Sequence, residues 1–430
     1  MSVRRATDAA WIASGERRVT VPAPCDWAPP PTFQPPADAT AALRTALHAP
    51  RGSASLRELA ASARSAAIAI PDLSRACPND LILPALLDQL NAGGIPDARI
   101  LVLIGCGLHR TTTEQEKRRL AGTQAWQRVR VADAQGSESP LADLGNTPDG
   151  CPVVMNAELA AADLAITVGV LEPHLYAGYS GGVKGIAIGC GGEPTILWTH
   201  RPAFISRAGV ELCRLEGNPF QHTLREVARR TRLAFGVMAV LDSDGTPVDV
   251  AAGDPTAVQE HLAARFGPLW LCETPTLYDV VVAGTKAPKH ENLYQASRAA
   301  TYVGLASRPA LADGGLLLLC TDLPNGAGDG PGEINFARVL ASANPDTVIR
   351  RGLEGPLGPG GQRAFVVANV LRRFRVGVCG SADPGLLRTL GMASYRSLAE
   401  GLADARTRPG HAPRILAIAD ALTTVVRAAG

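Results

Sequence analysis

Short apolar runs that alternate with helix-forming stretches are the feature that most constrains this fold. A first series of runs comprises Ala66–Ile70, Ile100–Ile104, Val129–Val131 and Leu164–Val170. A second series comprises Asp279–Gly284, Leu316–Cys320, Val376–Cys379 and Ile415–Ile418. Strands separated by helices form parallel sheets, because a parallel connection needs a long crossover. The sequence therefore predicts an α/β fold with mainly parallel sheets.

The length of 430 residues, of which 46% are hydrophobic, is more than one domain usually holds. We expect two α/β domains, an N-terminal one over residues 38–270 and a C-terminal one over residues 271–430, with a linker near Phe266–Leu277. Residues 1–37 are expected to form a proline-rich N-terminal arm. Seven prolines between Pro22 and Pro36 predict an extended segment without regular structure.

Short sequence motifs predict where two helices begin and where one β-hairpin turns. Thr113 and Glu116 have the spacing of a capping box at a helix start. Asp38 can cap a first helix. Asp244-Gly245 lies between two apolar runs and predicts a β-hairpin.

Charge and cysteine usage exclude several classes of protein. The formal net charge is +2 and no long run of one sign occurs, so neither nucleic acid nor an anionic membrane is the expected partner. No apolar run is long enough to span a membrane. The nine cysteines are scattered and predict neither a disulfide framework nor a Cys-x-x-Cys zinc site. We expect a cytoplasmic protein that binds a small molecule.

Polar residues follow the predicted strands, where open α/β sheets bind ligands. Pro71–Arg75, Gly105–Arg110 and Glu172–His174 follow strands of the first series, and Lys286–Arg298 follows the first strand of the second series. We expect these residues to line an active site in a cleft between the two domains.

The stretch Glu172–Glu193 contains seven glycines. Glycine lets the backbone approach a ligand closely, and N–H groups before a helix start can bind an anion. The spacing fits neither the Rossmann nor the Walker motif. The expected ligand of this loop is a phosphate or a carboxylate.

These motifs, above all residues 172–200, resemble the nickel-pincer-nucleotide-dependent lactate racemases and related 2-hydroxy-acid racemases and epimerases. The resemblance covers the chain from about Asp72 onward. It implies a pyridinium mononucleotide with two thiocarboxyl arms that holds nickel through two sulfurs and a ring carbon. It further implies that Lys184 carries this cofactor covalently and that His200 is the protein ligand of nickel. An imidazole suits Ni(II) as a ligand.

The same resemblance assigns the other site residues. His109 and His174 are the expected catalytic pair, each of which exchanges the substrate hydroxyl proton for one enantiomer. The residues expected at the substrate are Arg75, Tyr294, Gln295 and Arg298. The residues expected at the cofactor are Asp72, Gly178, Ser180, Gly181, Gly182 and Lys184. The implied reaction passes the α-hydrogen to the cofactor as hydride and proceeds through a 2-keto acid.

Two positions depart from the family. Well-known members carry lysine where this chain has Arg298, and they place a tryptophan near the region that here reads Glu354–Gln362 without an aromatic residue. Arginine and lysine are not interchangeable. A bulkier substrate, or one with a second carboxylate, would use both the guanidinium and the space.

Alternatives remain open at this stage. Three histidines could ligate zinc in a hydrolase, Arg75 could pair with Asp72 for structural reasons, and a conventional racemase could remove the α-hydrogen as a proton. The chain could also be a non-catalytic paralogue that binds the cofactor or an organic anion. The expected partners are a small 2-hydroxy acid and the enzymes that make the cofactor, whereas the oligomeric state stays open.

Overall fold

The computed structural model describes residues 2–6, 9–381, 383–405 and 412–430. It divides into two compact units. Unit 1 comprises Met1–Pro31, Arg201–Ser206 and Gly267–Gly430, whereas unit 2 comprises Thr32–His200 and Arg207–Phe266. Each unit contains a mainly parallel sheet with helices, which confirms the predicted fold class.

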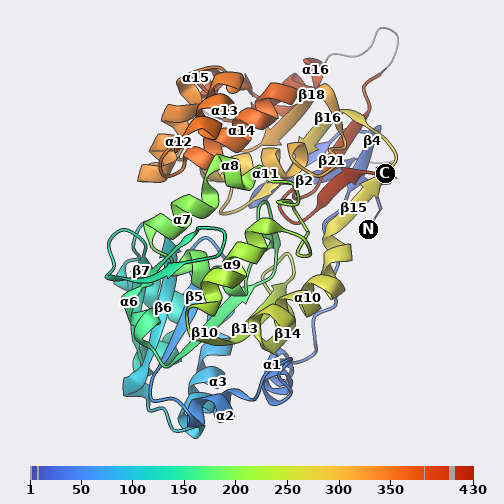
Figure 1. Ribbon diagram of the computed structural model, residues 1–430. Coiled ribbons are helices and arrows are strands. Elements are labelled where there is room, and N and C mark those ends of the chain that lie inside the picture. The colour runs from blue at the N-terminus through green and yellow to red at the C-terminus, as the bar shows by residue number, and fades with distance from the viewer. Residues whose placement is uncertain (1, 7–8, 382, 406–411) are drawn as a thin grey trace. The chain divides into compact units, whose positions relative to one another are not determined.

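The sheet of unit 2 has six strands, and all but one run parallel. In spatial order they are β14 (Pro247–Gly253), β13 (Leu233–Leu241), β10 (Leu164–Val170), β5 (Ala66–Pro71), β6 (Ile100–Gly107) and β7 (Arg130–Gln135). Figure 1 shows β6, β5, β10 and β13 side by side in this order. The antiparallel pair β13–β14 confirms the hairpin predicted at Asp244-Gly245.

Helices cover this sheet and build its core. The helices and helical turns are α1 (Ala39–His48), α2 (Leu56–Ala61), α3 (Asn79–Ala92), η1 (Asp97–Arg99), α4 (Glu114–Ala121), α5 (Thr123–Arg128), α6 (Ala157–Ala161), η2 (Gly185–Gly189), α7 (Glu193–His200), α9 (Pro219–Arg229) and α10 (Pro255–Trp270). Leu83 and Leu86 of α3 are fully buried against Ile68 and Ile166 of the central strands. Each such side chain contributes about 1.5–3 kcal/mol by leaving water.

Helix caps follow the sequence signals. Asp38 accepts hydrogen bonds from two backbone N–H groups at the start of α1. Thr113 and Glu116 form the predicted capping box of α4. Two short hairpins complete unit 2, β8 (Leu141–Asn146) with β9 (Pro152–Asn156) and β11 (Pro173–His174) with β12 (Gly178–Tyr179).

Unit 1 is built around a seven-stranded sheet in which only the edge strand β1 is antiparallel. In spatial order the strands are β1 (Arg4–Ala6), β4 (Cys25–Ala28), β21 (Ile415–Ile418), β16 (Tyr278–Ala283), β18 (Leu311–Cys320), β19 (Arg375–Cys379) and β20 (Ala393–Tyr395). Smaller sheets pair β2 (Ala10–Gly15) with β3 (Arg17–Val21) and β17 (Thr285–Lys286), and β15 (Leu271–Thr274) with β22 (Val425–Ala428). Its helices are α8 (Pro202–Ile205), α11 (Leu293–Gly304), α12 (Pro331–Ala341), α13 (Pro345–Glu354), α14 (Gly361–Arg373), α15 (Pro384–Thr389) and α16 (Leu398–Ala403).

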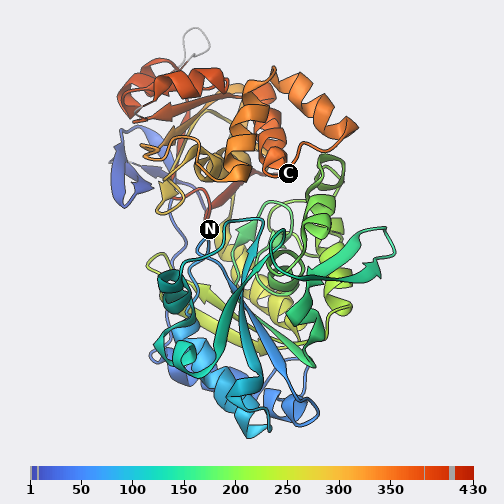
Figure 2. The same cartoon turned by 90° about the vertical axis from the view of Figure 1, so that its left-hand side faces the viewer.

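The expectation that Pro22–Pro36 has no regular structure is wrong for β4. This strand pairs with β21 and β1, and Figure 2 shows the dark-blue N-terminal strands against the other strands of unit 1. Pro24 and Pro29 flank β4 instead of interrupting it, so no hydrogen bond of the ladder is lost. Cys25 and Ala28 are fully buried, which holds the strand in the sheet.

The expected linker at Phe266–Leu277 is also regular structure. It contains the end of α10 and all of β15. Phe266 and Trp270 are buried, so this part of the chain is packed and does not run free. Within the described residues, no helix is long and apolar enough to cross a membrane.

Candidate functional site

Three adjacent strands of unit 2 carry polar side chains at their carboxyl ends. β10, β5 and β6 are neighbours and run parallel, so the residues that follow them meet at one edge of the sheet. Asp72 and Arg75 follow β5, His109 follows β6, and Glu172 follows β10. The sheet therefore brings together residues that are far apart in the sequence.

Asp72 and His109 form a close pair. His109 Nδ1 lies 2.7 Å from Asp72 Oδ2, and Ser74 donates to the other carboxylate oxygen from its hydroxyl at 2.6 Å and from its backbone N–H at 3.1 Å. Burial alone would raise the pKa of Asp72, but the charge of His109 and these hydrogen bonds outweigh it and hold that pKa well below its ordinary value.

This pairing fixes the hydrogen-bonding state of the imidazole. An ionised carboxylate only accepts hydrogen bonds, so the shared hydrogen belongs to His109 Nδ1. In the neutral ring Nε2 then bears the lone pair, and the side chain is 47% exposed. His109 is therefore prepared to accept a proton at Nε2, as a general base must be.

Arg75 pairs with Glu172 and not with Asp72. Arg75 Nε lies 3.2 Å from Glu172 Oε2, and Nη1 donates to the carbonyl oxygen of Ser74 at 3.2 Å. The alternative of a structural pair between Arg75 and Asp72 is thus wrong, because Asp72 is already occupied by His109 and Ser74. Glu172 instead holds a mostly buried guanidinium beside the Asp72–His109 pair.

The hydrogen bonds at Nδ1 of His174 run in the opposite direction to that at Nδ1 of His109. It lies in the hairpin β11–β12, and its Nδ1 accepts from the backbone N–H groups of Tyr176 at 3.3 Å and Ala177 at 3.2 Å. Because Nδ1 is an acceptor, the hydrogen of the neutral ring belongs to Nε2. His174 therefore carries an N–H where His109 carries a lone pair.

The glycine-rich loop after β11 is fixed by buried contacts. The hydroxyl of Ser180 donates to Val170 O at 2.7 Å and accepts from Glu172 N at 3.0 Å. Gly178 has φ +75°, and a Cβ there would lie 1.9 Å from the carbonyl oxygen of Arg214, so no other residue fits. Gly181 and Gly182 also have positive φ.

Lys184 stands at the end of this loop. It is half-buried and directly precedes the π-helical turn η2, and its backbone N–H donates to Gly181 O at 3.2 Å. π-Helical turns are rare and occur often at functional sites. The loop thus places a primary amine beside a distorted helix start.

His200 ends α7 within an aromatic cluster. Its ring centroid lies 5.7 Å from that of Tyr176 and 5.3 Å from that of Phe220, with the rings edge to face. Tyr176 also lies 5.9 Å from the ring of His174. The ring of Tyr176 thus contacts both histidines.

The side chains present suit a prosthetic group that binds through an amine and an imidazole. His200 Nδ1 lies 3.0 Å from the carbonyl oxygen of Ile196, which only accepts, so Nε2 bears the lone pair that a metal requires. Lys184 supplies the amine. Among the described residues, no group of three or more His, Cys, Asp or Glu side chains is arranged to hold a metal ion.

The remaining predicted residues lie in unit 1. Tyr294, Gln295 and Arg298 occupy the first turns of α11, whose start is capped by Asn292, which accepts from Gln295 N at 2.9 Å. The ring of Tyr294 packs edge to face on Phe336 of α12 with centroids 5.5 Å apart. The predicted residues therefore form two groups, one in each unit.

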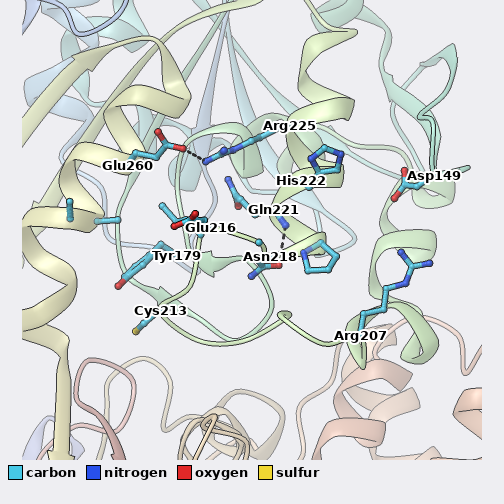
Figure 3. Close-up of a pocket in the computed structure, with 15 residues that line it drawn as sticks. Asp149, Tyr179, Arg207, Cys213, Glu216, Asn218, Gln221, His222, Arg225 and Glu260 are labelled. Atoms are coloured by element: carbon cyan, nitrogen blue, oxygen red, sulfur yellow. Dashed lines mark hydrogen bonds and ion pairs between the residues drawn. The ribbon is translucent and has the colours of Figure 1, made fainter.

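A pocket of about 960 Å³ lies elsewhere on unit 2. Figure 3 shows Asp149, Arg225, His222 and Glu260 around it, with Arg225 paired to Glu260. None of the predicted site residues lines this pocket. Its walls carry both signs of charge.

Sequence reasoning missed the pairing role of Glu172. The signal was present, because Glu172 directly follows a strand that neighbours the one before Arg75. Finding it required the strand order β10-β5-β6, which periodicity does not reveal.

Fold and site define a two-unit α/β protein whose strand ends carry an acid–base pair. Residues 15–211 match the lactate racemase N-terminal domain family. The chain is 28% identical over 393 residues to the lactate racemase of Lactiplantibacillus plantarum, with 90% of each chain covered. It is also 28% identical over 397 residues to the lactate racemase of Thermoanaerobacterium thermosaccharolyticum, again with 90% of each covered.

Solved structures show the same fold. The lactate racemase apoprotein from Thermoanaerobacterium thermosaccharolyticum matches with a TM-score of 0.87 at 24% identity, over 97% of this chain and 100% of that one. A crystal structure of a Thermotoga maritima protein matches with a TM-score of 0.66 at 13% identity, over 87% and 97%. The resemblance found in the sequence is confirmed, and the chain is a lactate racemase-like enzyme of the isomerase class.

Proposed function

We propose that this protein racemises or epimerises a small 2-hydroxy acid. The observation that carries the proposal is the Asp72–His109 pair, at 2.7 Å, beside the guanidinium of Arg75. A 2-hydroxy acid needs both a base for its hydroxyl proton and a cation for its carboxylate. The relatives that match over 90% of the chain are named lactate racemases.

His109 takes the hydroxyl proton at Nε2, and Asp72 stabilises the imidazolium that results. Arg75, held by Glu172, binds the carboxylate and keeps the substrate in place. His174 serves the opposite enantiomer, whose hydroxyl points to the other side of the site. Its Nε2 hydrogen faces away from the two backbone donors at Nδ1, so Nε2 is the atom that exchanges protons with the substrate oxygen.

Lys184 and His200 are the residues that would hold a nickel-pincer nucleotide, Lys184 as the covalent attachment and His200 as the metal ligand. When bound, this group supplies an acceptor that takes the α-hydrogen as hydride and returns it to either face of a 2-keto acid. The glycines around residues 178–182 let the backbone approach an anionic part of it. Enzymes that make the cofactor are then required partners for maturation.

The first test is intact-mass spectrometry of protein produced together with the cofactor-making enzymes. We expect an added mass on the wild type that is absent from Lys184→Ala and from Lys184→Arg, which keeps the charge but lacks a nucleophilic amine. An adduct that survives in Lys184→Ala would show that the attachment lies elsewhere.

The second test is racemisation in deuterated water by the loaded enzyme. Return of the same α-hydrogen as hydride leaves the product without solvent deuterium at that carbon. Deuterium incorporated at the α-carbon in each turnover would contradict hydride transfer and favour a conventional proton-abstracting racemase. Absence of inversion on every 2-hydroxy acid of a chiral panel would contradict racemase function and leave a binding protein.

A further inference from the structure

The carboxyl end of β7 lies beside the loop that carries His109. This loop, residues 108–113, connects β6 to α4. β7 pairs in parallel with β6, and Gln135 lies opposite Gly107 at the end of the ladder. Two mostly buried side chains at this end of β7 contact the loop, those of Asp133 (9% exposed) and Gln135 (7% exposed). They belong to neither the Asp72–His109 pair nor the glycine-rich loop.

Gln135 binds the backbone of His109 itself. Its Nε2 atom donates to His109 O at 3.3 Å. Its Oε1 atom accepts from Ser137 N at 2.6 Å and from Glu138 N at 2.8 Å. One side-chain amide therefore joins the loop of His109 to the turn that follows β7.

The backbone decides which way round the amide of Gln135 lies. Two N–H groups require an acceptor, so Oε1 faces Ser137 and Glu138, and the NH₂ group faces His109 O, which only accepts. A flipped amide would oppose oxygen to oxygen and N–H to N–H. A side chain of the same shape without N–H groups therefore cannot replace Gln135 at His109.

Asp133 binds the far end of the same loop. Its Oδ1 accepts from the hydroxyl of Thr112 at 2.6 Å, and its Oδ2 accepts from Thr112 N at 3.1 Å. Lys117 Nζ lies 3.3 Å from Asp133 Oδ2 and donates to Thr112 O at 2.9 Å. The backbone N–H, the carbonyl and the hydroxyl of Thr112 are thus all bound by this ion pair.

The start of the loop is bound from the same side. Gly107 has φ +55°, and its carbonyl oxygen accepts from Gly136 N at 2.6 Å. His109 N donates to Cys106 O at 2.9 Å, which closes a turn at the end of β6. The end of β7 and the residue after it therefore bind the loop at its start, at His109 and at Thr112.

The imidazole of His109 has one polar partner among the described residues. Its Nδ1 lies 2.7 Å from Asp72 Oδ2, and the side chain is 47% exposed. Asp72 follows β5, on the other side of β6 from β7. A backbone displacement of about 1 Å would take the ring out of hydrogen-bond distance of Asp72. The pair therefore depends on where the loop places its backbone.

We propose that Gln135 and Asp133 are positioning residues for His109. They hold the loop so that Asp72 accepts from Nδ1 and the lone pair of His109 stays on Nε2. The inference rests on the proposed function, in which His109 is a base, and adds two residues that act only through His109. Displacement of a reacting group by about 1 Å can lower a rate about 100-fold.

The test separates the two contacts of the Gln135 amide. Gln135→Glu keeps an acceptor for Ser137 N and Glu138 N but cannot donate to His109 O. Gln135→Met removes the same donor without adding a charge, and it also removes the acceptor. Arg130→Gln is the control, because Arg130 is an exposed residue at the other end of β7 that pairs with Glu158.

The tautomer of His109 in the unloaded full-length protein is the first readout. Long-range ¹H–¹⁵N spectra, assigned with His109→Gln, should show the hydrogen of the neutral ring on Nδ1 in the wild type and in Arg130→Gln. Both Gln135 variants should show a mixture of tautomers, because Asp72 then no longer selects one. A loss of stability alone would lower Tm and leave the tautomer of the folded protein unchanged.

Kinetics of the loaded enzyme give the second readout. We expect both Gln135 variants to lower kcat about 10- to 100-fold with KM within about threefold, since the base is displaced and the carboxylate site is not. Asp133→Leu should have a similar effect. Asp133→Asn still accepts from Thr112 and should recover part of kcat. Arg130→Gln should have wild-type kcat.

The outcomes distinguish this inference from the proposed function. Wild-type tautomer and kcat in both Gln135 variants would overturn the inference. Wild-type values in Gln135→Glu with losses only in Gln135→Met would assign Gln135 to the turn after β7 and overturn it as well. The expected tautomer mixture in a protein that racemises no 2-hydroxy acid would retain the positioning role and refute the proposed function. Racemisation with an unchanged tautomer in every variant would do the reverse.

Discussion

His109 and His174 follow strands of the same sheet, yet their imidazole rings are held in opposite ways. A carboxylate accepts from Nδ1 of His109, whereas two backbone N–H groups donate to Nδ1 of His174. The outward Nε2 atom is therefore an acceptor in one ring and a donor in the other. A racemase with two acid–base groups needs this difference, because one group removes a proton while the other supplies one.

The difference shows that the hydrogen-bond partner of Nδ1 decides whether Nε2 of a histidine accepts or donates a proton. Both rings have the same intrinsic chemistry, and the sequence treats them alike as histidines after strands. Asp72 stabilises a positively charged His109, but the amides at His174 favour the neutral ring as it stands. Under the proposed function, His109 is therefore the base of the first half-reaction.

The largest expected effect is loss of either histidine. His109→Gln and His174→Gln should each lower racemisation about 10³-fold in both directions, because every turnover needs both groups. Chiral chromatography starting from each pure enantiomer measures this. His222→Gln, an exposed histidine of unit 2, is the control and should be fully active. Full activity of either first variant in both directions would refute the two-base comparison.

Removal of the charge behind His109 should have a smaller effect. Asp72→Asn keeps a hydrogen-bond acceptor for Nδ1 but no longer stabilises the imidazolium, so we expect kcat to fall about 10²-fold. Asp149→Asn removes a carboxylate that bonds to Thr147 and Thr223 in the same unit, and it should leave kcat unchanged. Wild-type kcat in Asp72→Asn would mean that the pair has no catalytic use.

Loss of the support behind Arg75 should affect binding more than chemistry. Glu172→Gln removes the charge that holds the guanidinium, and we expect KM to rise about tenfold with kcat within about threefold. Steady-state kinetics of the loaded enzyme decide the point. A fall in kcat at unchanged KM would assign Glu172 to the chemical step instead.

The Asp72–His109 pair should also make stability depend on pH. The pKa of Asp72 is lowered in the folded state, so below about pH 4 the unfolded state binds more protons and stability falls. The advantage of wild type over Asp72→Asn should shrink as the pH falls from about 5 to 2, because the unfolded state then binds a proton at Asp72 that the folded carboxylate does not bind. Urea unfolding at several pH values in this range measures it, and an advantage that grows between about pH 5 and 2 would contradict the assignment.

The last prediction concerns the tautomers of the two histidines in the wild-type protein. Long-range ¹H–¹⁵N spectra of the unloaded protein should show hydrogen on Nδ1 of neutral His109 and on Nε2 of neutral His174, with the two glutamine variants providing the assignments. The same tautomer in both rings would remove the basis of the comparison.

Much of the fold was predictable because each strand of the central sheets is a short apolar run. Leu164–Val170 and Ile415–Ile418 were predicted with the bounds that the structure shows. β4 was missed since prolines on both sides hide a short buried segment. The contact between Arg75 and Glu172 was missed for a different reason, namely that strand order is a property of the whole sheet.

By itself the sequence determined the class of fold, the residues that end the strands and the glycine-rich loop, because these depend on local periodicity and on backbone conformations that only certain residues allow. The tertiary structure decided which nitrogen of each histidine is occupied and that Arg75 bonds to Glu172. Those facts follow from contacts between segments distant in the chain, and such contacts leave no periodic signal in the sequence.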